Sequence, residues 1–240
     1  MVLGATSGIA QALLRMMASN GKELLLVARS QERLDALRTD LLARGAVQVH
    51  TFEADFVSSQ DLVISFAKEC FPDFDTLVLA YGTMLDQSMC QVDPEYAIRE
   101  LQTNLVSAVG LLTRFAGYFE SRRSGTIAVI TSVAGDRGRR SNYVYGAAKG
   151  GLSIFLQGLR SRLHPFGVRV LTIKPGPVAT AMTASMSKLP MVESPEKVAT
   201  EIYRTLESPG TDVLYTPQRW RWIMAVVALI PERLFKRLSI

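Results

Sequence analysis

Short apolar runs alternate along the chain with segments in which apolar residues recur every three or four positions. Runs of this kind, bounded by polar residues or glycine, are typical of strands that are buried on both faces of a parallel sheet. After a first strand directly before Gly4, they predict strands at 23–28, 47–53, 76–80, 125–132, 168–173 and 213–215. Because so few residues precede Gly4, we expect the first strand either to be short or to begin upstream of this sequence.

The segments between these strands carry helical spacing. They predict a helix that Ser30 caps and Gly45 ends, and further helices at 58–70, 94–120 in two pieces, 143–164 and 194–206. Strands and helices that alternate in this way form a parallel sheet with helices on both faces. The sequence therefore predicts an α/β fold, a doubly wound Rossmann-type sheet of about seven parallel strands. We expect one domain over residues 1–216, followed by a hydrophobic and basic C-terminal helix within residues 217–240.

The composition narrows the class of protein. With 48% hydrophobic and 20% charged residues among 240, the chain is globular, neither disordered nor a small disulfide scaffold. The net charge of +5 suits an anionic ligand or an anionic membrane surface, but it is too small to indicate a nucleic-acid partner. Cys70 and Cys90 form no CxxC pair, so we expect no metal site and a reducing, cytoplasmic location. No run reaches the ~20 apolar residues that a membrane span needs.

A glycine-containing loop joins the first predicted strand to the first predicted helix. Glycines let the backbone turn tightly and approach a pyrophosphate, and the start of the helix supplies free N–H groups. The alternative is a plain strand–helix turn. The dinucleotide-binding interpretation assigns phosphate contacts to Gly4, Thr6, Ser7, Gly8 and Ile9.

The end of the second strand bears on the choice of dinucleotide. NAD-binding proteins place an acid here to hold the ribose 2′-OH, whereas this chain reads Val27, Ala28, Arg29, Ser30. The planar guanidinium of Arg29 suits a 2′-phosphate, although a solvated arginine at a helix start is the alternative. The sequence therefore favours NADP(H) and leaves NAD(H) open. Asp55 and Phe56, after the third strand, are expected to contact the adenine.

Four polar residues have the chemistry of a carbonyl-reducing site. Tyr145 and Lys149 lie four residues apart on one helix face, and Ser132 ends a strand shortly before them. A lysine ammonium and a nicotinamide ring would stabilise the phenolate and lower the tyrosine pKa. Ser132 could then hold a carbonyl oxygen while Tyr145 donates a proton. Asn104 lies in mid-helix, where its amide could hold a water that connects Lys149 with solvent.

Taken together, these motifs resemble the short-chain dehydrogenase/reductase family over nearly all of residues 1–216. The matches are GATSGIA at 4–10, Asp55, AYG at 80–82, Asn104, the ITS that ends at Ser132, YGAAK at 145–149 and PGPVAT at 175–180. The resemblance implies reversible hydride transfer between a nicotinamide cofactor and a carbonyl or alcohol, with a Ser132–Tyr145–Lys149 triad that Asn104 assists. It adds cofactor contacts at Ala80, Tyr81, Gly82, Tyr145, Lys149, Pro175, Gly176, Val178 and Thr180.

Three positions depart from the family pattern. Ala10 stands where a third glycine is usual, and Leu3 replaces a small hydroxyl residue. The Asn-Ala-Gly that the family carries after the fourth strand is Ala80, Tyr81 and Gly82 here, so an amide side chain is missing and the local hydrogen bonding is in question.

Three arginines lie between Ser132 and Tyr145. Arg137, Arg139 and Arg140 belong to a loop that borders the substrate mouth in this family, and they suit a phosphate or another anionic group. The alternative is a solvated basic loop, or salt bridges to Asp136 and a partner subunit.

The C-terminal tail, residues 217–240, combines an apolar run at 222–230 with tryptophans and basic residues. This arrangement suits a helix in a membrane interface or an apolar segment that covers an apolar substrate. The alternative is a helix buried in a dimer contact. The arginine loop and the tail resemble one branch of the family, the decaprenylphosphoryl-2-keto-ribose reductases. That resemblance implies a ketoreductase of a polyprenyl-phosphate-linked sugar, in the cytoplasm with peripheral contact at the inner face of the membrane.

Two other functions remain open at this point: a general reductase of 3-oxoacyl or other small ketones, and a non-catalytic, nucleotide-binding redox sensor. The family also implies a homodimer or homotetramer through the long helices at 94–120 and 143–164.

Overall fold

The computed structural model describes residues 1–184, 191–208 and 210–238. Within this part of the chain, seven parallel strands form one sheet in the order β3-β2-β1-β4-β5-β6-β7. The strands are β1 (Val2–Leu3), β2 (Glu23–Ala28), β3 (Gln48–Glu53), β4 (Thr76–Leu79), β5 (Thr126–Ile130), β6 (Arg169–Pro175) and β7 (Val213–Thr216). The predicted doubly wound parallel fold is confirmed, with a first strand of only two residues.

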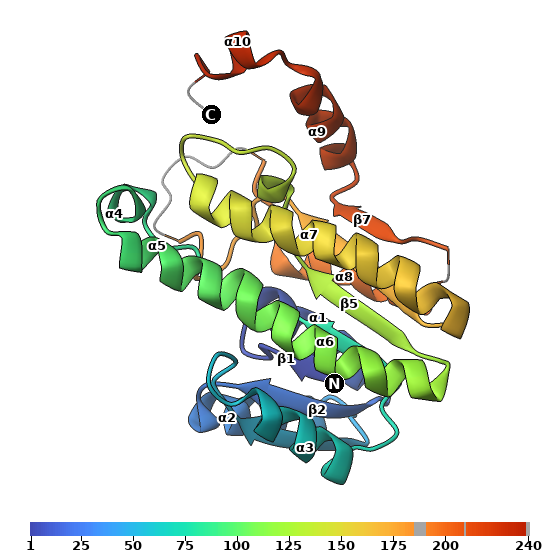
Figure 1. The fold of residues 1–240 in the computed structure, drawn as a ribbon. Helices are drawn as coiled ribbons and strands as arrows, with labels where there is room; N and C mark the ends of the chain where they lie inside the picture. Colours follow the sequence, from blue (N-terminus) through green and yellow to red (C-terminus); the bar gives the residue numbers. More distant parts are fainter. Residues whose placement is uncertain (185–190, 209, 239–240) are drawn as a thin grey trace.

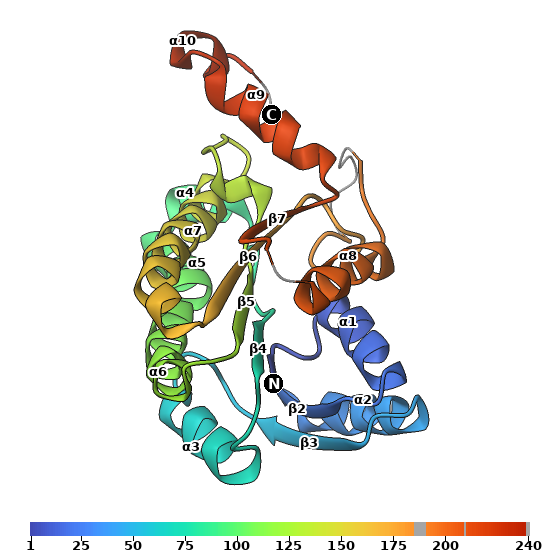
Figure 2. The ribbon, with the colours of Figure 1, turned by 90° about the vertical axis from the view of Figure 1, so that its right-hand side faces the viewer.

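Helices cover both faces of this sheet (Figure 1). They are α1 (Gly8–Ser19), α2 (Gln31–Ala43), α3 (Gln60–Cys70), α4 (Gln87–Val92), α5 (Pro94–Leu101), α6 (Ser107–Arg122), α7 (Tyr143–Leu163), α8 (Pro195–Glu207), α9 (Arg219–Leu229) and α10 (Glu232–Phe235). Short irregular turns are η1 (Gln102–Val106), η2 (Val133–Gly135) and η3 (His164–Phe166). Seen along the sheet, α3, α6 and α7 lie on one side and α1, α2 and α8 on the other (Figure 2).

Two hydrophobic cores hold the layers together. One packs the sheet against α3, α6 and α7 around the fully buried Phe115 and Phe119. The other packs it against α1, α2 and α8 around buried leucines such as Leu13 and Leu34. Because the inner strands are covered on both faces, their sequences are nearly continuous apolar runs, whereas the edge strand β3 (QVHTFE) is mixed and only partly buried.

The long helical stretch predicted at 94–120 is two helices, as expected. Their junction is η1, a π-helical turn that contains Asn104. A π turn widens the helix by one residue and is common at functional sites. The sequence pattern did not reveal α4, a six-residue helix that Asp86 caps.

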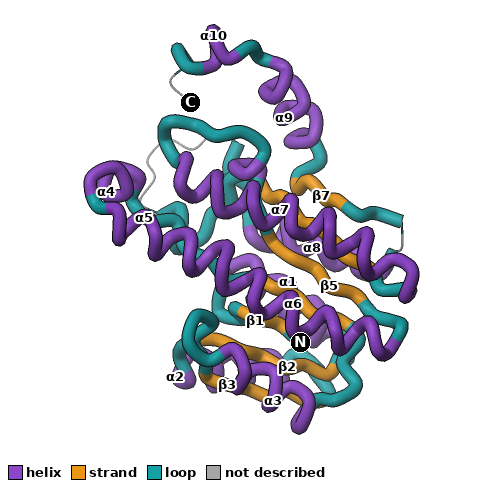
Figure 3. Tube along the Cα trace, viewed as in Figure 1, coloured by secondary structure: helices purple, strands orange, loops and turns teal. Residues whose placement is uncertain are grey.

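The tail forms two helices, with Pro231 between them, that extend away from the helical layers (Figure 2). Trp220 and Met224 on α9 pack against Val133, directly after β5. Figure 3 shows the loop from η2 to α7 at the same end of the molecule as α9 and α10. No helix among the described residues has the length and apolar character to cross a bilayer.

Candidate active site

The glycine loop joins β1 to α1 at the carboxyl edge of the sheet. Gly4 has a φ of +83°, and a Cβ there would lie 2.6 Å from the backbone nitrogen of Tyr81, so the position requires glycine. Ser7 caps α1 by accepting a hydrogen bond from the Ala10 amide at 3.3 Å. The next amides open the helix and have no partner within it, so the loop can receive a phosphate.

The loop after β6 lies against this glycine loop. A Cβ on Gly8 would come within 3.0 Å of the Thr180 methyl carbon. The Thr183 hydroxyl fixes the segment, because it donates to the Val178 carbonyl at 2.6 Å and accepts from the Thr180 amide at 3.1 Å. The structure thus brings together the two segments that the family pattern assigns to the cofactor.

Two arginines lie beside the glycine loop. Arg29 is exposed at the end of β2, as expected. Arg33, which the sequence analysis did not single out, donates to the Thr6 carbonyl at 3.0 Å. Its place one helical turn after Ser30 was the available signal. These two guanidinium groups fit a ribose phosphate, so the residues present suit NADP(H).

Asp55 and Phe56, the two residues predicted to contact the adenine, have different surroundings. Asp55 accepts from the Val57 and Ser58 amides at 2.9 and 3.0 Å. Burial opposes ionisation of Asp55, but these amides and the charge of Arg29 outweigh it and lower its pKa. The Phe56 ring is buried and stacks on Tyr81, with ring centroids 4.2 Å apart. An adenine contact of Phe56 would therefore involve its backbone.

Tyr81 supplies local hydrogen bonding in the segment after β4, where the family's amide side chain is missing. Its hydroxyl lies 2.8 Å from the Ser107 hydroxyl, which itself donates to the Thr103 carbonyl at 2.7 Å. Tyr81 thus ties the end of β4 to the start of α6, through a ring that is part of the core.

Ser132, Tyr145 and Lys149 come together beyond the end of β5. Ser132 accepts from the Ala134 amide at 3.1 Å and is hydrogen-bonded to the Tyr145 hydroxyl. Lys149 is 3% exposed, and its Nζ lies 5.8 Å from the centre of the Tyr145 ring. A hydroxyl, a phenol and an ammonium that converge at the end of a strand can polarise a carbonyl and donate a proton to it.

The pKa values of this pair follow their burial. Burial raises the pKa of Tyr145 to about 12, and the carboxylate of Glu100 adds to this, whereas the hydrogen bond with Ser132 lowers it. Burial lowers the pKa of Lys149 to about 8, and Glu100 opposes that shift. The pKa of Tyr145 thus lies above its ordinary value, the opposite of the lowering that we expected from Lys149. That lowering stays a prediction for the protein with its nicotinamide bound.

Asn104 lies within the π turn and holds the loop after β4. Its Oδ1 accepts from the Thr83 amide at 3.1 Å, and its Nδ2 donates to the carbonyls of Thr83 and Glu100 at 3.0 and 3.2 Å. A Cβ on Gly82 would lie 2.5 Å from the Asn104 Oδ1 and 3.1 Å from the Lys149 Nζ, so both side chains meet at this glycine. The expected water on the Asn104 amide stays a prediction.

Glu100 was missed by the sequence analysis. Its side chain is 1% exposed and lies next to the catalytic candidates. A polar residue in α5 gives no signal of burial, and only its spacing four residues before Asn104 places it on the same helical face.

Arg137 contacts the tail. It donates to the Ile230 carbonyl at 2.6 Å and also to that of Val227, at the end of α9. It pairs with Glu232 at 3.1 Å and lies over the Phe235 ring at 3.8 Å. The structure thus places Arg137 against the C-terminus of α9, where its charge complements the helix dipole.

Arg139 and Arg140 remain as candidates for an anionic group. The Arg139 Nε is buried and has no hydrogen-bond partner within the described residues. Burial lowers the pKa of Arg139, and Asp136 opposes this. Asp136 itself is held by Lys174 and by the Tyr215 hydroxyl at 3.0 Å, so it anchors the loop to β6 and β7.

Trp220 gives Gly176 a role that the family pattern did not assign. A Cβ on Gly176 would come within 1.9 Å of the indole Nε1, so the ring packs directly on this glycine. The start of α9 is therefore anchored on the loop after β6. Trp222 and Leu229, by contrast, are 69% and 82% exposed.

Among the described residues, no group of three or more His, Cys, Asp or Glu side chains is placed to hold a metal ion.

Comparisons with known proteins agree with this geometry. The chain is 37% identical over 240 residues to an uncharacterised oxidoreductase of Mycobacterium tuberculosis, covering 99% of this chain and 95% of that protein. It is 33% identical over 242 residues to an uncharacterised oxidoreductase of Streptomyces coelicolor, covering 100% and 95%.

Solved structures share the fold. A short chain dehydrogenase/reductase family protein is 27% identical with a TM-score of 0.77, covering 89% of this chain and 93% of that one. A short chain dehydrogenase of Burkholderia cenocepacia, in complex with NADP, is 23% identical with a TM-score of 0.83, covering 100% and 96%.

The comparisons support the family and do not single out the branch that acts on decaprenylphosphoryl sugars. The family model for short chain dehydrogenases matches residues 1–190. This chain belongs to the short-chain dehydrogenase/reductase family of oxidoreductases.

Proposed function

We propose that this oxidoreductase is an NADPH-dependent ketoreductase whose site consists of Ser132, Tyr145, Lys149 and Asn104. The observation that carries the proposal is the convergence of Ser132, Tyr145 and Lys149 at the end of β5. When bound, the nicotinamide would supply the hydride. Ser132 would hold the carbonyl oxygen, and Tyr145 would give it a proton.

Lys149 and Asn104 support this proton donor. The Lys149 ammonium lies close enough to the Tyr145 ring to stabilise negative charge on the phenol oxygen. Asn104 fixes Thr83 and, with it, the loop whose Gly82 lies against Lys149. Arg29 and Arg33 would bind the 2′-phosphate, which favours NADPH over NADH.

For the substrate, we propose a keto sugar linked to a polyprenyl phosphate. The buried and unpartnered Nε of Arg139 supports an anionic group at the mouth of the site. Arg140, in the same exposed loop, would add a second positive charge. Arg137 instead holds the tail in place beside this loop.

The tail supports the apolar part of that substrate. Trp222, Val226 and Leu229 are exposed and recur at helical spacing along α9, next to Arg219 and Arg221. An apolar stripe flanked by arginines suits a polyprenyl chain or an anionic membrane surface. The same stripe supports the proposal of peripheral contact at the inner face of the membrane.

The substrate proposal is tested by turnover of a polyprenyl-phosphate keto sugar beside a soluble 3-oxoacyl thioester, with NADPH in both assays. We expect Arg139→Gln to raise KM for the phosphorylated substrate and to spare the thioester, because this arginine would bind both ground state and transition state. Arg204→Gln, an exposed arginine on α8, is the matched control. Faster turnover of the thioester, with no effect of Arg139→Gln, would identify a general 3-oxoacyl reductase instead. Absence of turnover on every ketone would favour a redox sensor.

The oligomer is a further part of the proposal. Ile154 on α7 is exposed, as is Val106 at the end of η1, and both lie in the helical stretches that the family uses as dimer faces. We expect a homodimer or homotetramer, and sedimentation equilibrium at two protein concentrations measures it.

A further inference from the structure

Glu100 is a buried carboxylate next to the active site. It lies in the last turn of α5 and is 1% exposed. Its Oε2 accepts from the Thr83 hydroxyl at 2.8 Å and from the Leu85 amide at 3.2 Å. Its Oε1 is buried and has no hydrogen-bond partner in the part of the chain that the structure describes. A buried carboxylate oxygen without a partner is costly unless a nearby positive charge compensates for it.

The positive charge that faces Glu100 is Lys149. The two groups interact electrostatically across the interface of α5 with α7. The other titratable groups that face the carboxylate are Tyr145 on α7 and Cys90 on α4, and both are neutral acids. Glu100 is therefore the negative charge that faces the buried Lys149 ammonium, whose Nζ also donates to the Ile130 carbonyl at 3.4 Å.

A contiguous set of contacts connects the two charges. The Thr83 hydroxyl donates to Glu100 and accepts from the Asn104 Nδ2 at 3.1 Å. The Asn104 Oδ1 and the Lys149 Nζ in turn approach the same point beside Gly82. The carboxylate thus holds Thr83 in the orientation in which it binds Asn104.

We propose that Glu100 is a positioning residue of the active site, the buried counter-ion that keeps Lys149 protonated and fixes Thr83 and Asn104 beside it. The inference rests on the proposed function, because it concerns the same lysine and tyrosine. It assigns to Glu100 the task of setting the upper pH limit of activity.

The direction of this effect follows from the charges. Burial already lowers the pKa of Lys149 to about 8, and Glu100 prevents a larger fall. The ammonium exists below this pKa and is lost as pH rises through it. Glu100 also raises the pKa of Tyr145, so removing the negative charge lowers both pKa values. The alkaline limb of the kcat/KM profile therefore moves to lower pH.

The test compares Glu100→Gln with Glu95→Gln. The second variant removes an exposed carboxylate from the first turn of the same helix. We expect Glu100→Gln to move the alkaline limb down by about one pH unit, the scale of one nearby charge, and Glu95→Gln to leave it in place. Glu100→Asp, which keeps the charge, should restore most of the wild-type profile. Equal profiles for Glu100→Gln and wild type would overturn the proposal.

A second readout needs no turnover. Carbon-13 NMR of the lysine Cε atoms gives the pKa of Lys149 directly, with its signal identified from a Lys149→Met sample. We expect that pKa to fall in Glu100→Gln. An unchanged value would overturn the counter-ion role whatever the activity. The two proposals can also fail separately. If Glu100→Gln lowers the Lys149 pKa but Tyr145→Phe keeps full activity, the proposed function is overturned and the role of Glu100 is retained.

If Glu100→Gln does not fold, Thr83→Val serves in its place. It removes the hydroxyl that donates to the carboxylate, so it favours the neutral acid and should lower the Lys149 pKa in the same direction. Thr113→Val, on α6, is its control. No change in the lysine titration of Thr83→Val would count against the proposal.

Discussion

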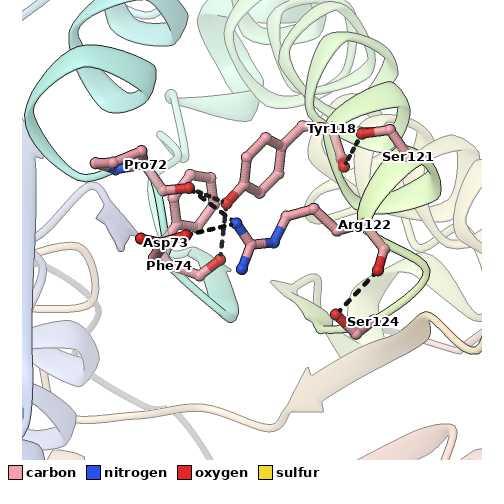
Figure 4. Close-up of polar contacts among 7 residues, drawn as sticks. All are labelled: Pro72, Asp73, Phe74, Tyr118, Ser121, Arg122 and Ser124. Carbon is pink, nitrogen blue, oxygen red and sulfur yellow. Dashed lines mark hydrogen bonds and ion pairs between the residues drawn. The ribbon is translucent and has the colours of Figure 1, made fainter.

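Two corners of the molecule, one at each edge of the sheet, differ in how their polar side chains are paired. At the amino edge, the Tyr118 hydroxyl donates to the carbonyls of Pro72 and Phe74, and Arg122 pairs with Asp73 at 2.9 Å (Figure 4). None of these residues has a buried side-chain polar atom without a partner in the described chain. At the carboxyl edge, Glu100 and Arg139 each have one.

The two corners differ because one only holds secondary-structure elements together, whereas the other is expected to bind ligands. The corner that holds α6 against the start of β4 is partly open to solvent, so its polar groups can pair with one another or with water, whereas a buried unpaired group costs about 1–3 kcal/mol. An edge that binds ligands retains unpaired groups and shifted pKa values. The Arg169 Nε at the start of β6 is also buried without a partner among the described residues, so the comparison supports the carboxyl edge as the site only together with the family motifs.

A large effect at the carboxyl edge is expected from Ser132→Ala. Removing the hydroxyl that would hold the carbonyl oxygen should lower kcat by about 10²–10³-fold, as for other donors of this type. Steady-state turnover of the best ketone measures it. Ser161→Ala, an exposed hydroxyl later on the same helix as Tyr145, should leave kcat unchanged. Comparable rates for wild type and Ser132→Ala would contradict the role of this serine.

Cofactor choice gives the next effect in size. Arg29→Gln should raise the Kd for NADPH by about 10–100-fold, the equivalent of one charged hydrogen bond, and change the Kd for NADH little. Fluorescence titration with each dinucleotide measures both constants, with Arg204→Gln as the control. Parallel losses for NADPH and NADH would show that Arg29 does not bind the 2′-phosphate.

The smallest effect is expected at the amino edge. Tyr118→Phe removes a hydroxyl that bonds two carbonyls, and it should lower the free energy of unfolding by about 1 kcal/mol, or Tm by about 2–4 °C. Calorimetry measures the shift, and kcat should stay at the wild-type value. A drop in kcat with an unchanged Tm would contradict the division between the two edges.

Most of the fold could be predicted because most of the strands are local apolar runs, with the edge strand β3 as the exception. The ends of these strands were predicted less accurately: β5 ends at Ile130 rather than Ser132, and β6 continues to Pro175. The missing helix α4 is short and polar, so it carries no amphipathic pattern.

The site could be predicted only where it follows a motif. Ser132, Tyr145 and Lys149 lie close together in the sequence, just beyond the end of β5 and on α7. The contacts of Arg137 with the end of α9, and of Trp220 with Gly176, join segments far apart along the chain. Glu100 has no local signal, because burial of a charge depends on the helices that pack around it.

The most direct test of the central claim is Tyr145→Phe, measured for both turnover and NADPH binding. The ring remains and only the proton donor is lost, so the Kd for NADPH should stay within a few-fold of wild type. Turnover of the best ketone should fall by about 10²–10⁴-fold, the contribution of a general acid. Turnover within a few-fold of wild type, with NADPH bound normally, would contradict the assignment of this site as a carbonyl-reducing centre.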